Sequence, residues 1–296
     1  MGNILTKQFY RQRKDFEDSC AGRDAGLTFP EGVRCSTDIA YADDGIKAHL
    51  LDIYRPEDSQ EKILPVIINV HGGGLIIGNK EFNRYFCALL CKKGFLVYSI
   101  EYRLIPDCLI YDQIADVFMA MDYIKERLAA DGGDSSHVYM AGDSGGACLI
   151  TYANAIQNST NIARAANVTP SGLRINALGL ISGMFYTSRF DKIGLFLPKY
   201  LYGRDYKKTP FAKYVNPENR ELLNSLAPVW LVTSHNDFLR RYTTDFEKAL
   251  TRAEREHELV VFPKNKKLTH AFSVFEPFLS ESSAVIDMMV EYLRKF

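Results

Sequence analysis

The stretch MAGDSGGACL, residues 140–149, decides the fold class because it places a serine between an apolar run and a helical run. The letters GDSGG also mark the nucleophile of trypsin-like proteases, which are built on β-barrels and carry His, Asp and Ser in that chain order. Here the apolar run HVYMAG precedes the serine, and the helix-forming run GACLITYANAIQ follows it. Candidate histidines also follow Ser144, so the stretch indicates a strand-to-helix turn and excludes the trypsin-like fold.

The glycines around Ser144 have the spacing of a nucleophile elbow. Gly142 and Gly146 stand two positions on either side of the serine, where the strand and the helix come too close for a side chain. The helix N-terminus adds the positive end of its dipole below the hydroxyl. Ser144 is therefore the predicted nucleophile, although a Gly-Ser-Gly turn alone can be structural.

A second motif, HGGGLIIG at residues 71–78, follows the apolar run PVIINV. A run of glycines frees backbone N–H groups to converge on one point, and such donors stabilise the oxyanion of a tetrahedral intermediate. We predict that the amides of Gly73 and Gly74 form this oxyanion hole together with the amide of Gly145. His71 is expected to hold the loop rather than to take part in chemistry.

Nucleotide and metal sites are disfavoured by the same residues. Gly73 and Gly78 have the spacing of a phosphate-binding loop, but Asn79 stands where the lysine is required and no Ser or Thr follows Lys80. The chain has no H-E-x-x-H motif, and His235 with Asp237 is an isolated pair. We expect no cofactor and no metal.

A serine nucleophile needs a base, and the base needs an orienting acid. In α/β-hydrolases the order is Ser, then Asp or Glu, then His, on turns after later strands. Asp237 directly follows the apolar run VWLVTS, and His270 lies in a polar loop between the last predicted strand and the last predicted helix. These two residues are the predicted acid and base. The histidines in less suitable positions are His49, His71, His137, His235 and His257.

The rest of the chain alternates buried-strand and helix patterns, which predicts an α/β fold with a mostly parallel sheet covered by helices on both faces. Residues 37–42 and 47–54 are predicted to pair as a hairpin across a turn that contains Gly45. The expected α/β-hydrolase core comprises residues 36–182 and 227–296.

Two segments do not fit this core. Residues 1–35 contain a predicted charged helix over about 7–18 and form an expected N-terminal cap segment. Residues 183–226 are rich in aromatic residues and lack a clear strand pattern, which indicates a cap or lid insertion whose rings line a closed pocket. A surface element that only adds stability is the alternative interpretation.

Composition limits the remaining functions. Lys plus Arg and Asp plus Glu number 36 each, so no basic field for nucleic acid is present. The six cysteines have no framework spacing and are expected to be free thiols. With no signal-peptide pattern and no long apolar run, we expect a cytoplasmic protein without stable membrane association. The opening MGNILT fits the short N-myristoylation pattern, which requires a eukaryotic host.

The combination of HGGG, then EYRLIPD at residues 101–107, then GDSGG resembles the hormone-sensitive-lipase family of α/β-hydrolase esterases over about residues 66–270. The resemblance implies a Ser144, Asp237 and His270 triad, a structural role for Glu101, and a cap formed by the N-terminal helices and a late insertion. The chain departs from the family pattern at Gly145, where alanine is common, and at Ala147, where glycine is frequent. The FLRR sequence after Asp237 also lacks the usual proline and second acid.

These motifs predict a serine carboxylesterase that acts on a small-molecule ester. The resemblance mainly favours short acyl groups, acetyl to butyryl, on aryl or sugar alcohols. A peptidase or amidase acting on small acylated substrates and a non-catalytic ligand-binding member of the same fold stay open as alternatives. An exposed edge strand would allow a homodimer.

Overall fold

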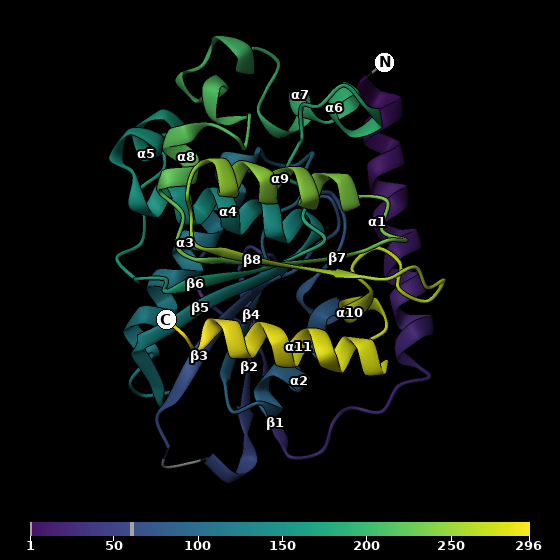
Figure 1. Cartoon of the computed structure of the whole chain (residues 1–296), viewed down its shortest axis with the longest axis vertical. Helices are drawn as coiled ribbons and strands as arrows, with labels where there is room; N and C mark the ends of the chain where they lie inside the picture. Colours follow the sequence, from purple (N-terminus) through teal and green to yellow (C-terminus); the bar gives the residue numbers. More distant parts are fainter. Residues whose placement is uncertain (1, 60–61) are drawn as a thin grey trace.

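The computed structural model describes residues 2–59 and 62–296, and Met1 of the MGNILT pattern lies outside them. The described residues form one eight-stranded sheet in the order β1-β2-β4-β3-β5-β6-β7-β8 (Figure 1). The strands are β1 (Val33–Ala40), β2 (Leu50–Pro56), β3 (Leu64–Val70), β4 (Leu96–Ile100), β5 (Gly133–Asp143), β6 (Ala177–Ile181), β7 (Val229–Ser234) and β8 (His257–Phe262).

The six neighbouring strands β4, β3, β5, β6, β7 and β8 are parallel. The pairs β1–β2 and β2–β4 are antiparallel. The central strands β6 and β7 are buried along their whole length, whereas the edge strand β1 is largely exposed. Continuous apolar runs are required where both faces of a parallel strand are covered by helices. The predicted α/β fold with a mostly parallel sheet is therefore confirmed.

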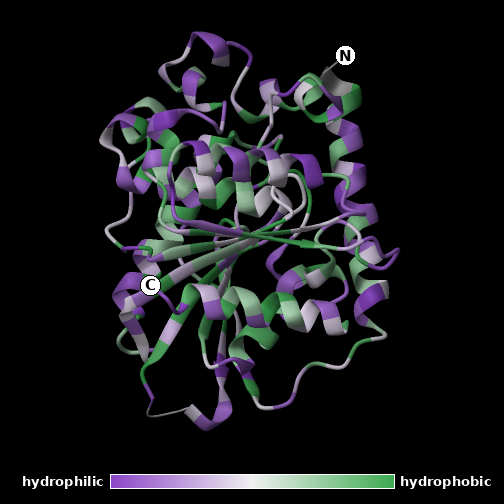
Figure 2. Ribbon diagram, viewed as in Figure 1, coloured by the Kyte–Doolittle hydropathy of each residue, from purple (hydrophilic) through white to green (hydrophobic). Residues whose placement is uncertain are grey.

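Helices cover both faces of the sheet (Figure 1). On one face lie α3 (Ile110–Arg127), α4 (Ser144–Asn158), α5 (Thr160–Ala166) and α9 (Arg240–Arg252), and on the other lie α2 (Arg84–Lys92), α10 (Phe272–Phe275) and α11 (Ser280–Leu293). Hydrophobic residues follow the central strands, and hydrophilic residues dominate α1 (Figure 2). Apolar residues at helical spacing on α3 and at its C-cap are buried in the core: Ile114, Val117, Phe118, Met121, Ile124 and Leu128.

The N-terminal helix α1 (Gly2–Asp24) is longer than the predicted 7–18 segment. No proline interrupts the region, and the chain leaves the helix only near Gly26. Most of α1 is exposed, but the ring of Phe9 is nearly buried and packs edge-on against Tyr200, with 5.2 Å between ring centroids. The N-terminal segment therefore contacts the 183–226 insertion.

The predicted hairpin pairs as expected, but its connection is longer than one turn. Residues 41–49 separate β1 from β2, because Asp44 accepts the amide of Ile46 and its other oxygen lies 2.6 Å from Nδ1 of His49. This local hydrogen bonding competes with strand pairing and delays the start of β2 to Leu50.

Residues 183–226 contain no strand, as expected. They form the short helices α6 (Lys192–Phe196), α7 (Pro198–Leu201) and α8 (Arg220–Asn224), with the 3₁₀ turns η3 (Tyr206–Lys208) and η4 (Pro210–Tyr214). Several of its rings are buried in the core: Phe185, Tyr202, Phe211 and Tyr214. Phe211 contacts Tyr111 of α3 and Tyr152 of α4, so the insertion is anchored to the core helices.

Two smaller expectations concern the cysteines and membranes. All six cysteines are free thiols; Cys87, Cys91 and Cys148 are buried, and the other three are partly buried. Within residues 2–59 and 62–296, no helix combines the length and apolarity that crossing a bilayer requires.

Candidate active site

Ser144 sits at the sharp turn between β5 and α4, with a left-handed φ of 49°. A Cβ at Gly146 would lie 2.1 Å from the carbonyl oxygen of Val70, and one at Gly142 would lie 2.9 Å from the backbone of Gly146. Only glycine fits at these two positions, for the reason expected from the sequence. The backbone strain at Ser144 is the geometry of a nucleophile elbow.

The structure brings Ser144, Asp237 and His270 together. Nε2 of His270 lies 2.9 Å from Oγ of Ser144, and its Nδ1 lies 2.7 Å from Oδ1 of Asp237. Both distances are within hydrogen-bond range, so the three side chains form one continuous chain. With Nδ1–H donating to Asp237, Nε2 is left to accept the proton of the serine hydroxyl.

Asp237 is buried at the end of β7 and receives several hydrogen bonds. The hydroxyl of Thr233 donates to Oδ2 at 2.8 Å, and the amide of Leu239 donates to Oδ1 at 2.8 Å. Burial would raise the pKa of Asp237, but the hydrogen bond and charge of His270, with the donors around it, hold the pKa below its usual range. Asp237 is therefore ionised and can orient the imidazole without the second acid that is common after this position.

His270 is held in the loop between β8 and α10 by the residue that follows it. Ala271 adopts a left-handed φ of 49°, and its amide donates to Oγ of Ser182 at 3.1 Å. The ring of Phe238 lies against the imidazole, with 4.4 Å between centroids. The backbone after His270 is thus held by Ser182, and the ring of Phe238 contacts one side of the imidazole.

The glycine loop lies against the elbow. Gly73 and Gly74 have positive φ values of 105° and 62°, and the amides of Ile76 and Ile77 both donate to the carbonyl oxygen of Gly73. A Cβ at Gly145 would lie 3.0 Å from the amide nitrogen of Gly74. In the described part of the chain, the amides of Gly73 and Gly74 have no acceptor. Such unsatisfied donors beside a serine can bind a developing oxyanion.

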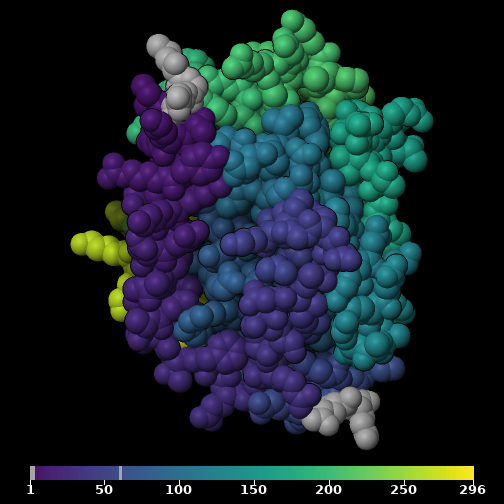
Figure 3. Space-filling view, turned by 180° about the vertical axis from the view of Figure 1, so that it is seen from behind, coloured from purple at the N-terminus to yellow at the C-terminus, as the bar shows by residue number. Residues whose placement is uncertain are grey.

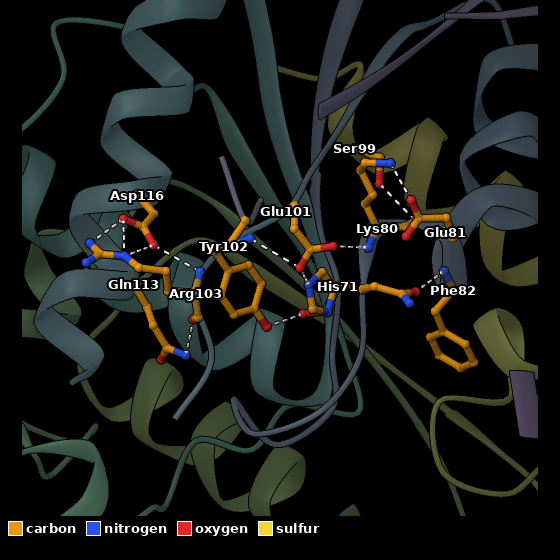
Figure 4. A network of polar contacts seen from close by, with 12 residues as sticks. His71, Lys80, Glu81, Phe82, Ser99, Glu101, Tyr102, Arg103, Gln113 and Asp116 are labelled. Atoms are coloured by element: carbon orange, nitrogen blue, oxygen red, sulfur yellow. Dashed lines mark hydrogen bonds and ion pairs between the residues drawn. The ribbon is translucent and has the colours of Figure 1, made fainter. Parts of the chain in front are cut away.

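His71 supports this loop through a buried network (Figure 4). Its Nε2 lies 3.0 Å from Oε1 of Glu101, its Nδ1 lies 2.8 Å from the carbonyl oxygen of Gly72, and its own carbonyl accepts the hydroxyl of Tyr102. Burial would lower the pKa of His71, but the charge and hydrogen bond of Glu101 outweigh it and raise that pKa. These contacts favour the protonated form of His71 and hold its ring in place, which fits the expected role of supporting the loop.

The remaining histidines do not approach Ser144. His235, the nearest in sequence to Asp237, has its Nδ1 2.9 Å from Nη1 of Arg240. The others are paired with carboxylates: His49 with Asp44 and Asp116, His137 with Asp134, and His257 with Glu247.

The sequence analysis did not identify several residues that hold the catalytic side chains and the glycine loop in place. Buried Asp143, inside GDSGG, accepts the amide of Gly72 and the side chain of Asn83, both at 3.0 Å, and so ties the elbow to the glycine loop. The position of Asp143 inside the GDSGG motif could have indicated its role, but nothing in the sequence around Asn83 indicates a role for that residue. Ser182 and Thr233 follow no motif either, because their roles depend on contacts between separate strand ends.

A family model described as alpha/beta hydrolase fold matches residues 67–273, well over half of the chain. The chain belongs to the α/β hydrolase fold family. This membership confirms the family expected from the HGGG and GDSGG motifs, and the matched range contains all six predicted site residues.

Named relatives of this α/β hydrolase are esterases. Isoprenylcysteine alpha-carbonyl methylesterase ICME of Arabidopsis thaliana is 28% identical over 155 residues, which cover 52% of this chain and 35% of the relative. Esterase LipQ of Mycobacterium tuberculosis is 33% identical over 120 residues, which cover 40% of this chain and 28% of the relative. The chain thus spans less than half the length of these two relatives.

Solved esterases share the fold of this hydrolase at low sequence identity. Esterase B from Lactobacillus rhamnosis has a TM-score of 0.92 at 22% identity and covers 100% of this chain and 96% of its own. A bacterial heroin esterase has a TM-score of 0.72 at 23% identity and covers 98% of this chain and 92% of its own. At these identities the likeness establishes the common fold.

Proposed function

We propose that this α/β hydrolase is a serine carboxylesterase that cleaves short-chain acyl esters. The observation that carries the proposal is the hydrogen-bonded chain from Asp237 through His270 to Ser144. A serine whose hydroxyl lies 2.9 Å from an oriented imidazole is arranged for nucleophilic attack. The names of the relatives add support for ester substrates.

The mechanism follows from these contacts. His270 takes the proton of Ser144 as the oxygen attacks the ester carbonyl, and the amides of Gly73, Gly74 and Gly145 hold the oxyanion. The imidazolium then protonates the leaving alcohol, and water repeats the cycle on the acyl-enzyme. Asp237 keeps the imidazole in the required tautomer.

We propose a small ester as the substrate, with an acetyl to butyryl acyl group, and α1 with residues 183–226 as its cap. The contact of Phe9 with Tyr200 joins the two cap segments, and Phe238 presents an apolar ring beside His270. An amidase acting on small acylated substrates would use the same three residues, so the leaving group has to be tested separately.

The test is hydrolysis of nitrophenyl acetate, butyrate and octanoate by the wild type and by Ser144→Ala. We expect rapid turnover of the two shorter esters and its loss in the variant. Equal rates in the two proteins would overturn the proposed function and favour a non-catalytic binding role. Comparing nitrophenyl butyrate with the matching nitroanilide distinguishes an esterase from an amidase.

A further inference from the structure

Arg13, on the N-terminal helix α1, reaches across to the glycine loop. Its Nε donates to the carbonyl oxygen of Ile76 at 2.8 Å, and its Nη2 donates to the carbonyl oxygen of Ile105 at 2.6 Å. Ile76 is the second residue after HGGG, and Ile105 lies in the EYRLIPD segment. One guanidinium therefore joins α1 to two loops that are 29 residues apart, counted from 76 to 105.

The third nitrogen of the guanidinium is held by an acid. Nη1 of Arg13 donates to Oδ2 of Asp107 at 2.7 Å, and the hydroxyl of Tyr10, one turn earlier on α1, hydrogen-bonds the other oxygen of Asp107. Burial would raise the pKa of Asp107, but the hydrogen bonds from Tyr10 and Arg13 outweigh it and lower that pKa. The planar fork of an arginine suits such a multidentate site, and a lysine cannot reproduce it.

The rest of the glycine loop is tied to the same segment. The carbonyl oxygen of Leu75 accepts the amide of Ile105 and the side-chain amide of Gln113, both at 3.0 Å. Leu75 and Ile76 immediately follow Gly74, and the amide of Ile76 donates back to the carbonyl of Gly73. Moving the Ile76 carbonyl would therefore move the peptide units of the oxyanion hole.

The helix lies where this role requires it. In the view from behind, α1 runs along one edge of the molecule against the blue part of the chain that follows β3 (Figure 3). The Arg13 side chain is only 18% exposed, whereas the Arg11 side chain, two residues earlier, is 82% exposed and pairs only with Asp15 in the described chain. Most of α1 is polar surface, so the mostly covered guanidinium distinguishes Arg13 from Arg11.

We propose that Arg13 is a positioning residue that holds the glycine loop so that the amides of Gly73 and Gly74 face the reacting carbonyl. This role rests on the proposed esterase function, because it acts on the oxyanion of that reaction. Through Arg13, helix α1 would affect the rate of turnover by positioning the glycine loop, in addition to any role in substrate binding. A misplacement of about 1 Å at a reacting centre can lower a rate about 100-fold.

The test compares Arg13→Met and Arg13→Lys with Arg11→Met, a matched change on the same helix. We expect kcat for nitrophenyl butyrate to fall roughly 10- to 100-fold in Arg13→Met with KM within about twofold, since the loop stabilises the transition state more than the bound ester. Arg13→Lys should recover only part of the rate, and Arg11→Met should match the wild type. The rate of inactivation by a phosphonate, which also forms an oxyanion, should fall with kcat.

The outcomes separate the two proposals. If Ser144→Ala keeps its turnover, the esterase function fails, whatever Arg13 does. If Ser144→Ala is inactive but folded Arg13→Met keeps the wild-type kcat, the positioning role is wrong and the contacts are structural. If Arg13→Met does not fold, Asp107→Asn gives the second reading: a normal kcat and a normal phosphonate rate in that variant would also overturn the role.

Discussion

The buried side chain of His71 lies between two acceptors, with Oε1 of Glu101 3.0 Å from Nε2 and the carbonyl oxygen of Gly72 2.8 Å from Nδ1. Because a carboxylate oxygen and a carbonyl oxygen both accept hydrogen bonds, this geometry favours the imidazole that carries both protons. His270 differs in one contact, since its Nε2 faces the hydroxyl of Ser144. The same residue type therefore supports the glycine loop at one position and can accept a proton beside the nucleophile at the other.

The His71 and Glu101 pair makes stability depend on pH. The pKa of His71 is raised in the folded protein, so the pair contributes fully below the unfolded pKa of about 6.5 and loses its contribution as pH rises through the folded pKa. We expect Glu101→Gln to lower the melting temperature most at pH 5.5 to 6.5 and progressively less at higher pH. Thermal unfolding of both proteins between pH 5.5 and 9 checks this, and a gap that widens with pH would contradict it.

The triad assignment predicts losses that do not add. Ser144→Ala and His270→Ala should each reduce kcat by roughly 10⁴-fold or more, and the double variant should be no worse than either, because the two residues act as one unit. The kcat of Asp237→Asn should also fall steeply, because an amide side chain can stabilise the wrong tautomer of the His270 imidazole. The measurement is kcat for nitrophenyl butyrate on proteins shown to be folded by circular dichroism. A folded His270→Ala variant with wild-type turnover would mean that the base is another residue.

Gly145 allows a test of the oxyanion hole that leaves the triad untouched. A Cβ there would lie 2.8 Å from the amide nitrogen of Leu75 and 3.0 Å from that of Gly74, so Gly145→Ala must push the glycine loop away. Complete removal of one oxyanion donor costs about 2.7–4 kcal/mol, and a partial shift should lower kcat roughly tenfold. Steady-state kinetics with nitrophenyl butyrate measures this effect. An unchanged kcat would mean that the glycine loop accommodates the added methyl group without moving its amides. The alanine that is common at this position in the family would require such an accommodation.

The sequence was sufficient for the parts of the site that local geometry dictates. Ser144 between Gly142 and Gly146 could be placed on a strand-to-helix turn because close backbone approach excludes every residue except glycine there. His270 could be chosen because its loop follows the last strand and precedes the last helix. Both inferences use short-range patterns together with the chain order of one known topology.

Other features depend on contacts between distant residues and leave no local pattern. Arg13 sits in a charged helix, and nothing in its neighbours distinguishes it from Arg11. In residues 183–226, Phe211 packs against Tyr111 of α3 and Tyr152 of α4, two partners that the aromatic composition of the segment did not indicate. Aromatic composition predicts burial and does not say against which surface a ring is buried.

Phe238 gives the most direct prediction about substrate preference. Its side chain is 74% exposed, yet its ring lies 4.4 Å from the imidazole of His270, centroid to centroid. An exposed aromatic ring beside a proposed catalytic base offers apolar surface to the bound ester. Covering about 50 Å² of such surface contributes roughly 1 kcal/mol, or about a fivefold change in affinity.

We therefore expect Phe238→Ala to raise KM for nitrophenyl butyrate about fivefold while kcat and the melting temperature change little, because an exposed ring contributes little to folding. Phe278→Ala is the matched control, since that ring is also exposed, at 49%, but packs against Tyr85. The control should leave both kinetic constants unchanged. Equal KM values in all three proteins would mean that the ester approaches Ser144 from a side that Phe238 does not border.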